Sequence, residues 1–183
     1  TAFLVVVLGP VLLGASFVGM TVATVSRDRT VERLDHATTT VRTAVGAVCR
    51  QLQAAADAVA VLPPESRPAA ADQLVRRGLA SVVTTAEDPD WRDCSAATGD
   101  GVQAVAARAE TSDGVVVAAQ TIDAGFIDRL AASSGADVVL RTGGLGTLTG
   151  HATRATGTGG GEPVTTREID TGPGQPLPLT ISV

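Results

Sequence analysis

The chain opens with an uninterrupted apolar run and then changes to a repeating pattern of apolar and polar positions. Residues 2–25 carry no charged side chain, and as a helix they would extend for about 36 Å at a rise of about 1.5 Å per residue. This length is sufficient to cross a bilayer core of about 30 Å. The pattern predicts a transmembrane helix over residues 1–25 rather than a signal peptide, whose apolar part is only about 7–15 residues.

Small residues within this predicted span recur at a spacing of four. Ala15, Gly19 and Ala23 would form a stripe on one side of the helix, and such stripes let two membrane helices approach closely. The alternative is that glycine and alanine are simply common in membrane helices. Arg27 and Arg29 follow the span at once, and basic residues favour the cytoplasmic side of a membrane. The orientation of the rest of the chain therefore stays open.

A long stalk helix is predicted over residues 26–62, because apolar residues recur there at heptad spacing before the Pro63-Pro64 pair. This pattern is typical of a coiled-coil seam or of a long helix packed on one apolar stripe. We expect the stalk to pair with a second copy in a homodimer and also to contact the following sheet. The alternative is a stripe that only covers the sheet within one chain. The heptad positions are Val31, Leu34, Thr38, Val41, Val45, Val48, Leu52, Ala55, Val59 and Leu62.

Residues 63–183 alternate short apolar runs with turn-forming residues, which predicts an α+β domain in which helices pack on one antiparallel sheet. One helix is expected over residues 69–79. Another begins after Asp123, which can cap it, and stops at Gly135 in a left-handed conformation. The expected strands are residues 80–85, 101–110, 115–122, 136–141, 145–151, 164–169 and 177–183.

Turn and loop signals separate these strands. The Asp113-Gly114 pair lies between two apolar runs and predicts a β-hairpin. The polar segment of residues 87–94 is expected to be a loop, and the glycine-rich segment of residues 152–163 is expected to be another.

Composition narrows the possible functions. All 14 basic residues are arginine, and the chain has no lysine, tyrosine or asparagine. The absence of lysine excludes a P-loop lysine and a Schiff base with pyridoxal phosphate. The net charge of −5 and the presence of only three phenylalanines and one tryptophan argue against nucleic acid as a partner, because its binding needs basic patches and aromatic stacking.

The titratable side chains form no catalytic or metal-binding pattern. His36 and His151 are distant in sequence from each other and from both cysteines, without the close pairs of zinc sites. Neither histidine stands in the context of a catalytic triad, and no G-x-S-x-G motif is present. We therefore expect no catalytic residue, no metal and no cofactor, and expect that this chain is not an enzyme.

Cys49 and Cys94 are the two cysteines of the chain. In an oxidising compartment they would form a disulfide that closes a loop of about 45 residues and contributes roughly 3–4 kcal/mol. The alternative is two buried free thiols.

What remains is recognition of a small molecule, for which arginine donors beside apolar walls are a common means. Trp91 and Arg92, followed by Asp93, precede the predicted hairpin and would supply a wall and a charge pair. Arg108 and Gln120 are polar residues within otherwise apolar strands. We expect a ligand site lined by Trp91, Arg92, Arg108 and Gln120. The alternative is that Arg108 is solvated at a strand end and Trp91 fills core space.

Two runs of the chain carry a resemblance. The run FIDRLAASSGADVVLRTGGLGTLTG at residues 126–150 resembles the membrane-proximal half of Cache or PAS-like extracytoplasmic sensor domains. The run SRDRTVERLDHATTTVR at residues 26–42 is similar to the first signalling helix of bacterial receptors that end in diguanylate-cyclase and phosphodiesterase modules or in histidine kinases.

This resemblance implies a PAS/Cache-like sensor domain at the cell membrane that faces outside and binds a small ligand. It also implies a second membrane crossing and a cytoplasmic output module beyond this chain. Two other interpretations stay open. One is a purely structural domain that dimerises a membrane receptor, and the other is a cytoplasmic GAF-like sensor behind the anchor.

Overall fold

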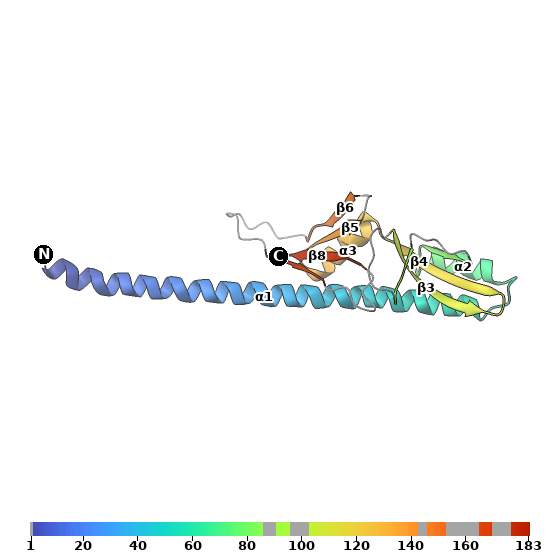
Figure 1. Cartoon of the computed structure of the whole chain (residues 1–183), viewed down its shortest axis with the longest axis horizontal. Coiled ribbons are helices and arrows are strands. Elements are labelled where there is room, and N and C mark those ends of the chain that lie inside the picture. Colours follow the sequence, from blue (N-terminus) through green and yellow to red (C-terminus); the bar gives the residue numbers. More distant parts are fainter. Residues whose placement is uncertain (1, 86–90, 96–102, 143–145, 153–164, 170–176) are drawn as a thin grey trace.

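The computed structural model describes residues 2–85, 91–95, 103–142, 146–152, 165–169 and 177–183, and it describes side chains within these ranges from residue 29 onward, except at 141, 142 and 146. Helix α1 spans Ala2–Ala60 and contains 59 residues. The N-terminal half of α1 extends beyond the sheets as a single rod, and the C-terminal half lies along them (Figure 1). The predicted span and the predicted stalk are therefore parts of one continuous helix.

The predicted membrane span, residues 2–25, lies in the part of α1 whose side chains are outside the described residues, as does the stripe of Ala15, Gly19 and Ala23. Among the residues that the structure describes, no helix combines the length and the apolar character needed to cross a membrane.

The heptad stripe of α1 is buried against the chain's own sheets. Leu34, Val41, Val45 and Leu52 are each at most 2% exposed, and α1 contacts strands of both sheets described below. Val31, at the start of the stripe, is 48% exposed. The predicted contact between stalk and sheet is confirmed. Because the sheets occupy the stripe, it is not available as a coiled-coil seam between two chains.

Sheet A lies along the C-terminal part of α1 and contains β1 (Val82–Thr84), β2 (Trp91–Asp93), β3 (Ala104–Thr111) and β4 (Gly114–Thr121). The strand order is β1-β4-β3-β2. The β3–β4 pair is the predicted hairpin, in which Thr111 faces Gly114 and Gly114 has a φ of 139°. The β2–β3 pair is parallel, and the other two pairs are antiparallel.

Sheet B lies nearer the middle of α1 (Figure 1). It contains β5 (Asp137–Thr142), β6 (Gly146–Gly150), β7 (Thr166–Glu168) and β8 (Leu179–Ser182), in the order β6-β5-β8-β7 with antiparallel pairing throughout.

The described part of the chain also contains two helices shorter than α1. Helix α2 spans Arg67–Arg76 rather than the predicted 69–79, and the chain leaves it through Gly78 with a φ of 70°. Helix α3 spans Ala124–Ser134 between the two sheets in sequence. The predicted cap of α3 is confirmed, since the Asp123 carboxylate accepts a hydrogen bond from the Phe126 N–H at 2.7 Å. The left-handed stop at Gly135 is also confirmed, with a φ of 66°.

Two expectations about the sheets are wrong. Within the described residues, the strands form two four-stranded sheets rather than one, because α3 separates β4 from β5 and each set of strands pairs only within itself. Residues 91–93 form a strand rather than a loop. These three residues carry no alternating pattern of their own and become a strand by pairing with β3, so the strand depends on tertiary contacts.

The C-terminus lies beside α1, at the end of the sheets where the helix enters them (Figure 1). Val183 exchanges two backbone hydrogen bonds with Thr165, at 3.2 and 3.3 Å. The neighbouring β7 contributes Arg167, which forms an ion pair with Asp35 of α1. The C-terminal strands are thus linked to α1 near the point where the helix enters the sheets.

Candidate functional site

The side chains of sheet A point alternately to two faces, and the pairing register assigns each predicted site residue to one of them. Residues that face each other across neighbouring strands lie on the same side of a sheet. Arg92 and Gln120 both face Val105, which is packed in the core with α1. Trp91 faces Ala104 instead. We call the side of Val105 the helix face and the side of Ala104 the outer face.

The four predicted ligand residues are therefore divided between two faces. Trp91 and Arg108 belong to the outer face, whereas Arg92 and Gln120 belong to the helix face. Because a sheet of backbone lies between the two pairs, a single pocket on one face cannot contact all four. Neighbouring residues in a strand point to opposite sides, so Trp91 and Arg92 could not have formed one wall.

The outer face has a small apolar centre. Trp91 is half-buried and packs there together with Val115. The residues beneath are small and lie between 1% and 3% exposed, and we call them the outer cluster: Ala104, Ala106, Val117 and Ala119. Val82 of β1, which faces Ala119, is 39% exposed at the edge of this surface.

An ion pair lies beside this apolar centre. The Arg108 Nε is 3.4 Å from a carboxylate oxygen of Asp93, and their side chains are 43% and 27% exposed. The backbone N–H and the hydroxyl of Ser95 donate to the same carboxylate at 2.8 and 2.5 Å. The sequence suggested a charge pair between Arg92 and Asp93, but these adjacent residues point to opposite faces, and Arg108 is the arginine that reaches Asp93 on the outer face.

On the helix face, Arg92 and Gln120 flank the fully buried Val105 and are each half-buried. The Gln120 side-chain amide donates to the Thr121 carbonyl at 3.3 Å. Strand β3 contacts α1 on this face, so Arg92 and Gln120 lie on the side of the sheet that packs on the helix, apart from the outer face.

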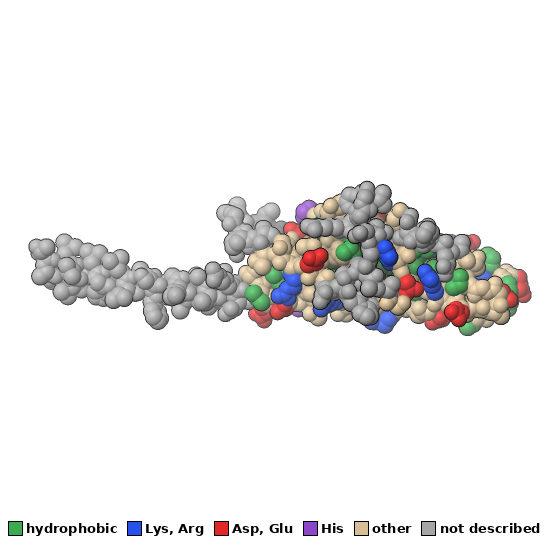
Figure 2. Space-filling model, in the orientation of Figure 1, with side chains coloured by type: hydrophobic (Ala, Val, Ile, Leu, Met, Phe, Trp, Pro, Cys, Tyr) green, Lys and Arg blue, Asp and Glu red, His purple; other side chains and the backbone are tan. Residues whose placement is uncertain are grey.

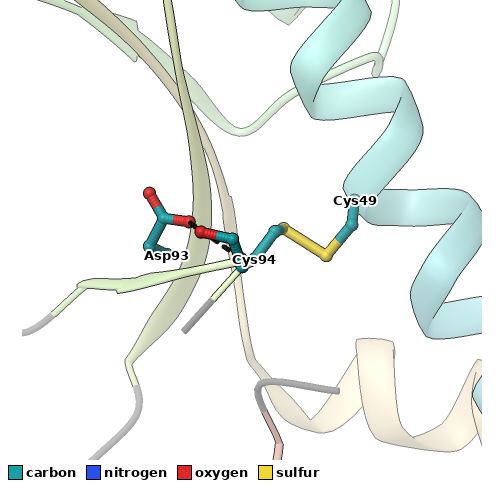
Figure 3. The surroundings of a disulfide bond; sticks show 4 residues. Cys49, Asp93 and Cys94 are labelled. Carbon is teal, nitrogen blue, oxygen red and sulfur yellow. Dashed lines mark hydrogen bonds between the residues drawn. A yellow bond between two sulfur atoms is a disulfide. The ribbon is translucent and has the colours of Figure 1, made fainter. Parts of the chain in front are cut away.

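Cys49 of α1 and Cys94, directly after β2, form a disulfide with a Cα–Cα distance of 5.7 Å (Figure 3). Cys94 follows the alternation of β2 and lies on the helix face, while the neighbouring Asp93 side chain points away from the disulfide (Figure 3). The sequence allowed either a disulfide or two buried free thiols. In the structure the two sulfurs are bonded. The bond ties the edge strand of sheet A to the long helix.

Several polar contacts were not expected from the sequence. The Gln53 side-chain amide donates to the Arg108 carbonyl at 3.0 Å and so connects α1 to β3. Arg67 donates to the carbonyls of Leu62, just after α1, and of Ala60, the last residue of α1, at 3.0 and 3.4 Å. The Asp93-x-Ser95 spacing, typical of a turn in which an aspartate accepts from its own backbone, was the one signal in the sequence for the Ser95 contact.

Among the described residues, neither histidine belongs to a cluster of side chains that could bind a metal ion. His151 lies 3.6 Å from Asp137 with its side chain 74% exposed, and His36 is exposed on α1. Within the described ranges, no three histidine, cysteine, aspartate or glutamate side chains are grouped so that they could hold a metal ion.

No protein-family model matches the chain, and no curated protein and no solved structure matches it either. An indole ring over small apolar residues, beside an arginine and a carboxylate that are both partly exposed, is suited to hold a small molecule with a polar end. The face of the molecule drawn in Figure 2 mixes acidic and basic side chains over its coloured part.

Proposed function

We propose that the chain is a membrane-anchored, extracytoplasmic sensor module of the Cache/PAS-like kind. It binds a small ligand on the outer face of sheet A and passes a conformational change through α1 to a cytoplasmic output module. The observation that carries this proposal is the continuity of α1, which runs without a break from the uncharged residues 2–25 to the buried contacts with both sheets.

The ligand part of the proposal is supported by Trp91, Asp93 and Arg108 on one face. The Arg108 side chain is 43% exposed, and a guanidinium binds carboxylates and similar anions with paired hydrogen bonds. A ligand with such a group would compete with Asp93 for Arg108 and place its apolar part against the indole. A ligand that binds more tightly to one arrangement of the Asp93–Arg108 pair shifts the population of molecules toward that arrangement.

The transmission part is supported by the way both sheets share one helix. Sheet A is bonded to α1 through Cys94, and sheet B is joined to α1 through Arg167 and Asp35. The C-terminus lies at the same end of the sheets as the incoming helix (Figure 1). A small sliding or rotation of α1 relative to the sheets is a known class of switching motion.

The partners of this module are proposals as well. We propose that the membrane holds the N-terminal half of α1 and that two copies associate as a homodimer through this half, because the sheets cover the apolar stripe farther along the helix. The output module would be of the cyclic-di-GMP or histidine-kinase type that the sequence resemblance implies. Signal recognition, rather than catalysis by this chain, is the proposed activity.

A ligand screen tests the sensor function. The full chain in detergent is screened against small carboxylates, amines and amino acids by thermal shift, and hits are measured by calorimetry. We expect a hit whose affinity falls at least about tenfold in Arg108→Ala, the loss of one charge-assisted contact. The matched control is Arg129→Ala, an exposed arginine on α3, which should bind normally. Equal binding by both variants would refute the proposed site.

A structural role in receptor assembly is the second candidate. One observation favours it: the Asp93 carboxylate already has three donors in Arg108 and Ser95, and Trp91 already packs on the outer cluster. Under this alternative, light scattering finds a dimer while the screen finds no ligand. Under the sensor proposal, a ligand is found and changes the thermal midpoint.

The side of the membrane is tested separately by labelling. Ala58→Cys introduces a thiol at an exposed position of α1 near sheet A. An extracytoplasmic domain predicts that a membrane-impermeant maleimide labels this thiol in intact cells. Labelling only after lysis would favour the cytoplasmic GAF-like alternative.

A further inference from the structure

The edge strand β2 is weakly held by its sheet. It pairs with β3 over three residues in parallel, and parallel pairing is slightly less stable per residue than antiparallel pairing. In the described part of sheet A, β3 is the one strand beside it. The Cys94 N–H adds one further hydrogen bond to the Ala106 carbonyl at 2.8 Å. So short a strand at an edge needs support from other contacts.

The Cys49–Cys94 bond supplies that support from the helix face. Cys49 belongs to α1, whose neighbouring residues Val45 and Leu52 are at most 1% exposed. Cys94 packs against the same core. The disulfide therefore joins a rigid position of α1, Cys49, to the edge strand β2, which is the less stable of the two elements.

The opposite side of β2 holds Trp91 against the outer cluster. Alanine and valine side chains bury little surface by themselves, and a large ring lying over them contributes much of the apolar contact on this face. Trp91 is also the sole tryptophan of the chain. Its position depends on β2, and the position of β2 depends on the disulfide.

We propose that the Cys49–Cys94 disulfide is a reducible lock: its reduction releases β2 and lifts Trp91 from the outer cluster, while the β3–β4 hairpin stays folded. In this step a dithiol reductant supplies two electrons and two protons. The Sγ–Sγ bond breaks, both cysteines become thiols, and the reductant closes to its own disulfide. This inference holds whether or not a small ligand binds.

Cys49 and Cys94 are only partly buried, so a small dithiol can approach this part of the chain. The hairpin, in contrast, has its own support. Its helix face contains Val116 and Ala118, which are at most 1% exposed, and eight residue pairs join its strands. Opening the lock therefore changes the edge of sheet A and leaves its centre intact.

The test uses the full chain in detergent and the fluorescence of Trp91, which needs no added probe. With dithiothreitol, we expect the emission to move to longer wavelength as the indole enters water. We also expect the Cys94 amide to exchange hydrogen at least about tenfold faster, as local opening requires. The β3–β4 amides should keep their protection.

The Cys49→Ser/Cys94→Ser variant is the matched control. It should show the shifted emission without reductant and no further response to dithiothreitol. Two outcomes would overturn the proposal: free thiols with unchanged Trp91 emission and unchanged Cys94 exchange, or loss of protection in β2 and the hairpin together. The second outcome would mean that the bond holds the whole sheet rather than its edge.

Discussion

Sheets A and B pack on the same helix with different core side chains. The core of sheet B contains large aliphatic residues, including Leu140, Leu179 and Ile181, all fully buried. The helix face of sheet A contains mainly alanine and valine, such as Ala107 and Ala118. Because stabilisation by burial grows with apolar area, at roughly 25 cal/mol per Å², sheet B gains more from each buried side chain than sheet A does.

The difference shows what else holds sheet A. The disulfide joins it to α1, and the Gln53 amide donates to the Arg108 carbonyl. Arg67 connects the end of α1 to the region of the β3–β4 turn, where its Nη2 is 3.8 Å from Asp113. Sheet A thus depends on a covalent bond and polar contacts in addition to its small apolar contacts, whereas sheet B depends mainly on packing, with the Arg167–Asp35 ion pair beside it.

The largest effect is expected from the core of sheet B. Leu140→Ala should lower the free energy of unfolding by about 2–5 kcal/mol, because it removes buried methyl groups and leaves a cavity. Val116→Ala on the helix face of sheet A should cost less, about 1–2.5 kcal/mol, since fewer atoms are removed. Urea denaturation of both variants measures the contrast. An equal or larger loss for Val116→Ala would contradict the stronger packing of sheet B.

The next effect is expected from the disulfide. Cys49→Ser combined with Cys94→Ser should lower the free energy of global unfolding by about 2–4 kcal/mol, because the unfolded chain regains freedom that a loop of 45 residues had lost. Urea denaturation followed by circular dichroism measures it, and reduction of the unchanged chain should reproduce the loss. A change below about 0.5 kcal/mol would show that sheet A does not need the bond.

A smaller effect is expected where β6 of sheet B packs closely on α3. A Cβ at Gly150 would lie 2.6 Å from the Ile127 carbonyl oxygen of α3. Gly150→Ala should therefore destabilise by about 1–3 kcal/mol, since the strand or the helix must move. Gly46→Ala is the matched control within α1, where the new Cβ would be 3.5 Å from the end of the Arg50 side chain. That variant should stabilise by about 0.5–1 kcal/mol. Thermal midpoints that move in the same direction for both variants would contradict this account.

The smallest effect concerns the start of α3, which covers sheet B. Asp123→Ala removes the acceptor for the Phe126 N–H and should cost about 1 kcal/mol. Asp128→Ala removes an exposed carboxylate from the same helix and should change stability by less than about 0.5 kcal/mol. Chemical denaturation distinguishes them, and equal losses would show that the cap is not the cause.

Local signals predicted part of the fold well. The β3–β4 hairpin follows from Asp113-Gly114 between two apolar runs, and the limits of α3 follow from Asp123 and Gly135. The heptad stripe predicted a long helix with one buried side. Each of these features depends on residues close together in sequence, which is why the pattern alone was sufficient.

Contacts between distant residues decided the candidate site. Trp91 and Arg108 are 17 positions apart, and only the register of β2 against β3 shows that both lie on the outer face, apart from Arg92 and Gln120. The parallel pairing of β2 has no local signal. The prediction of one four-residue site failed for this reason.

The sequence by itself determined the uncharged N-terminal run, the long helix with one apolar side, the hairpin, the caps of α3 and the α+β class. The tertiary structure decided that the strands form two sheets, that the apolar stripe of α1 is covered within the chain, that Cys49 meets Cys94, and that Arg108 meets Asp93. The physical reason is the distance along the sequence over which each kind of interaction acts. Periodicity and capping act over a few residues, whereas strand register, sheet closure and a bond across 45 positions depend on the whole folded chain.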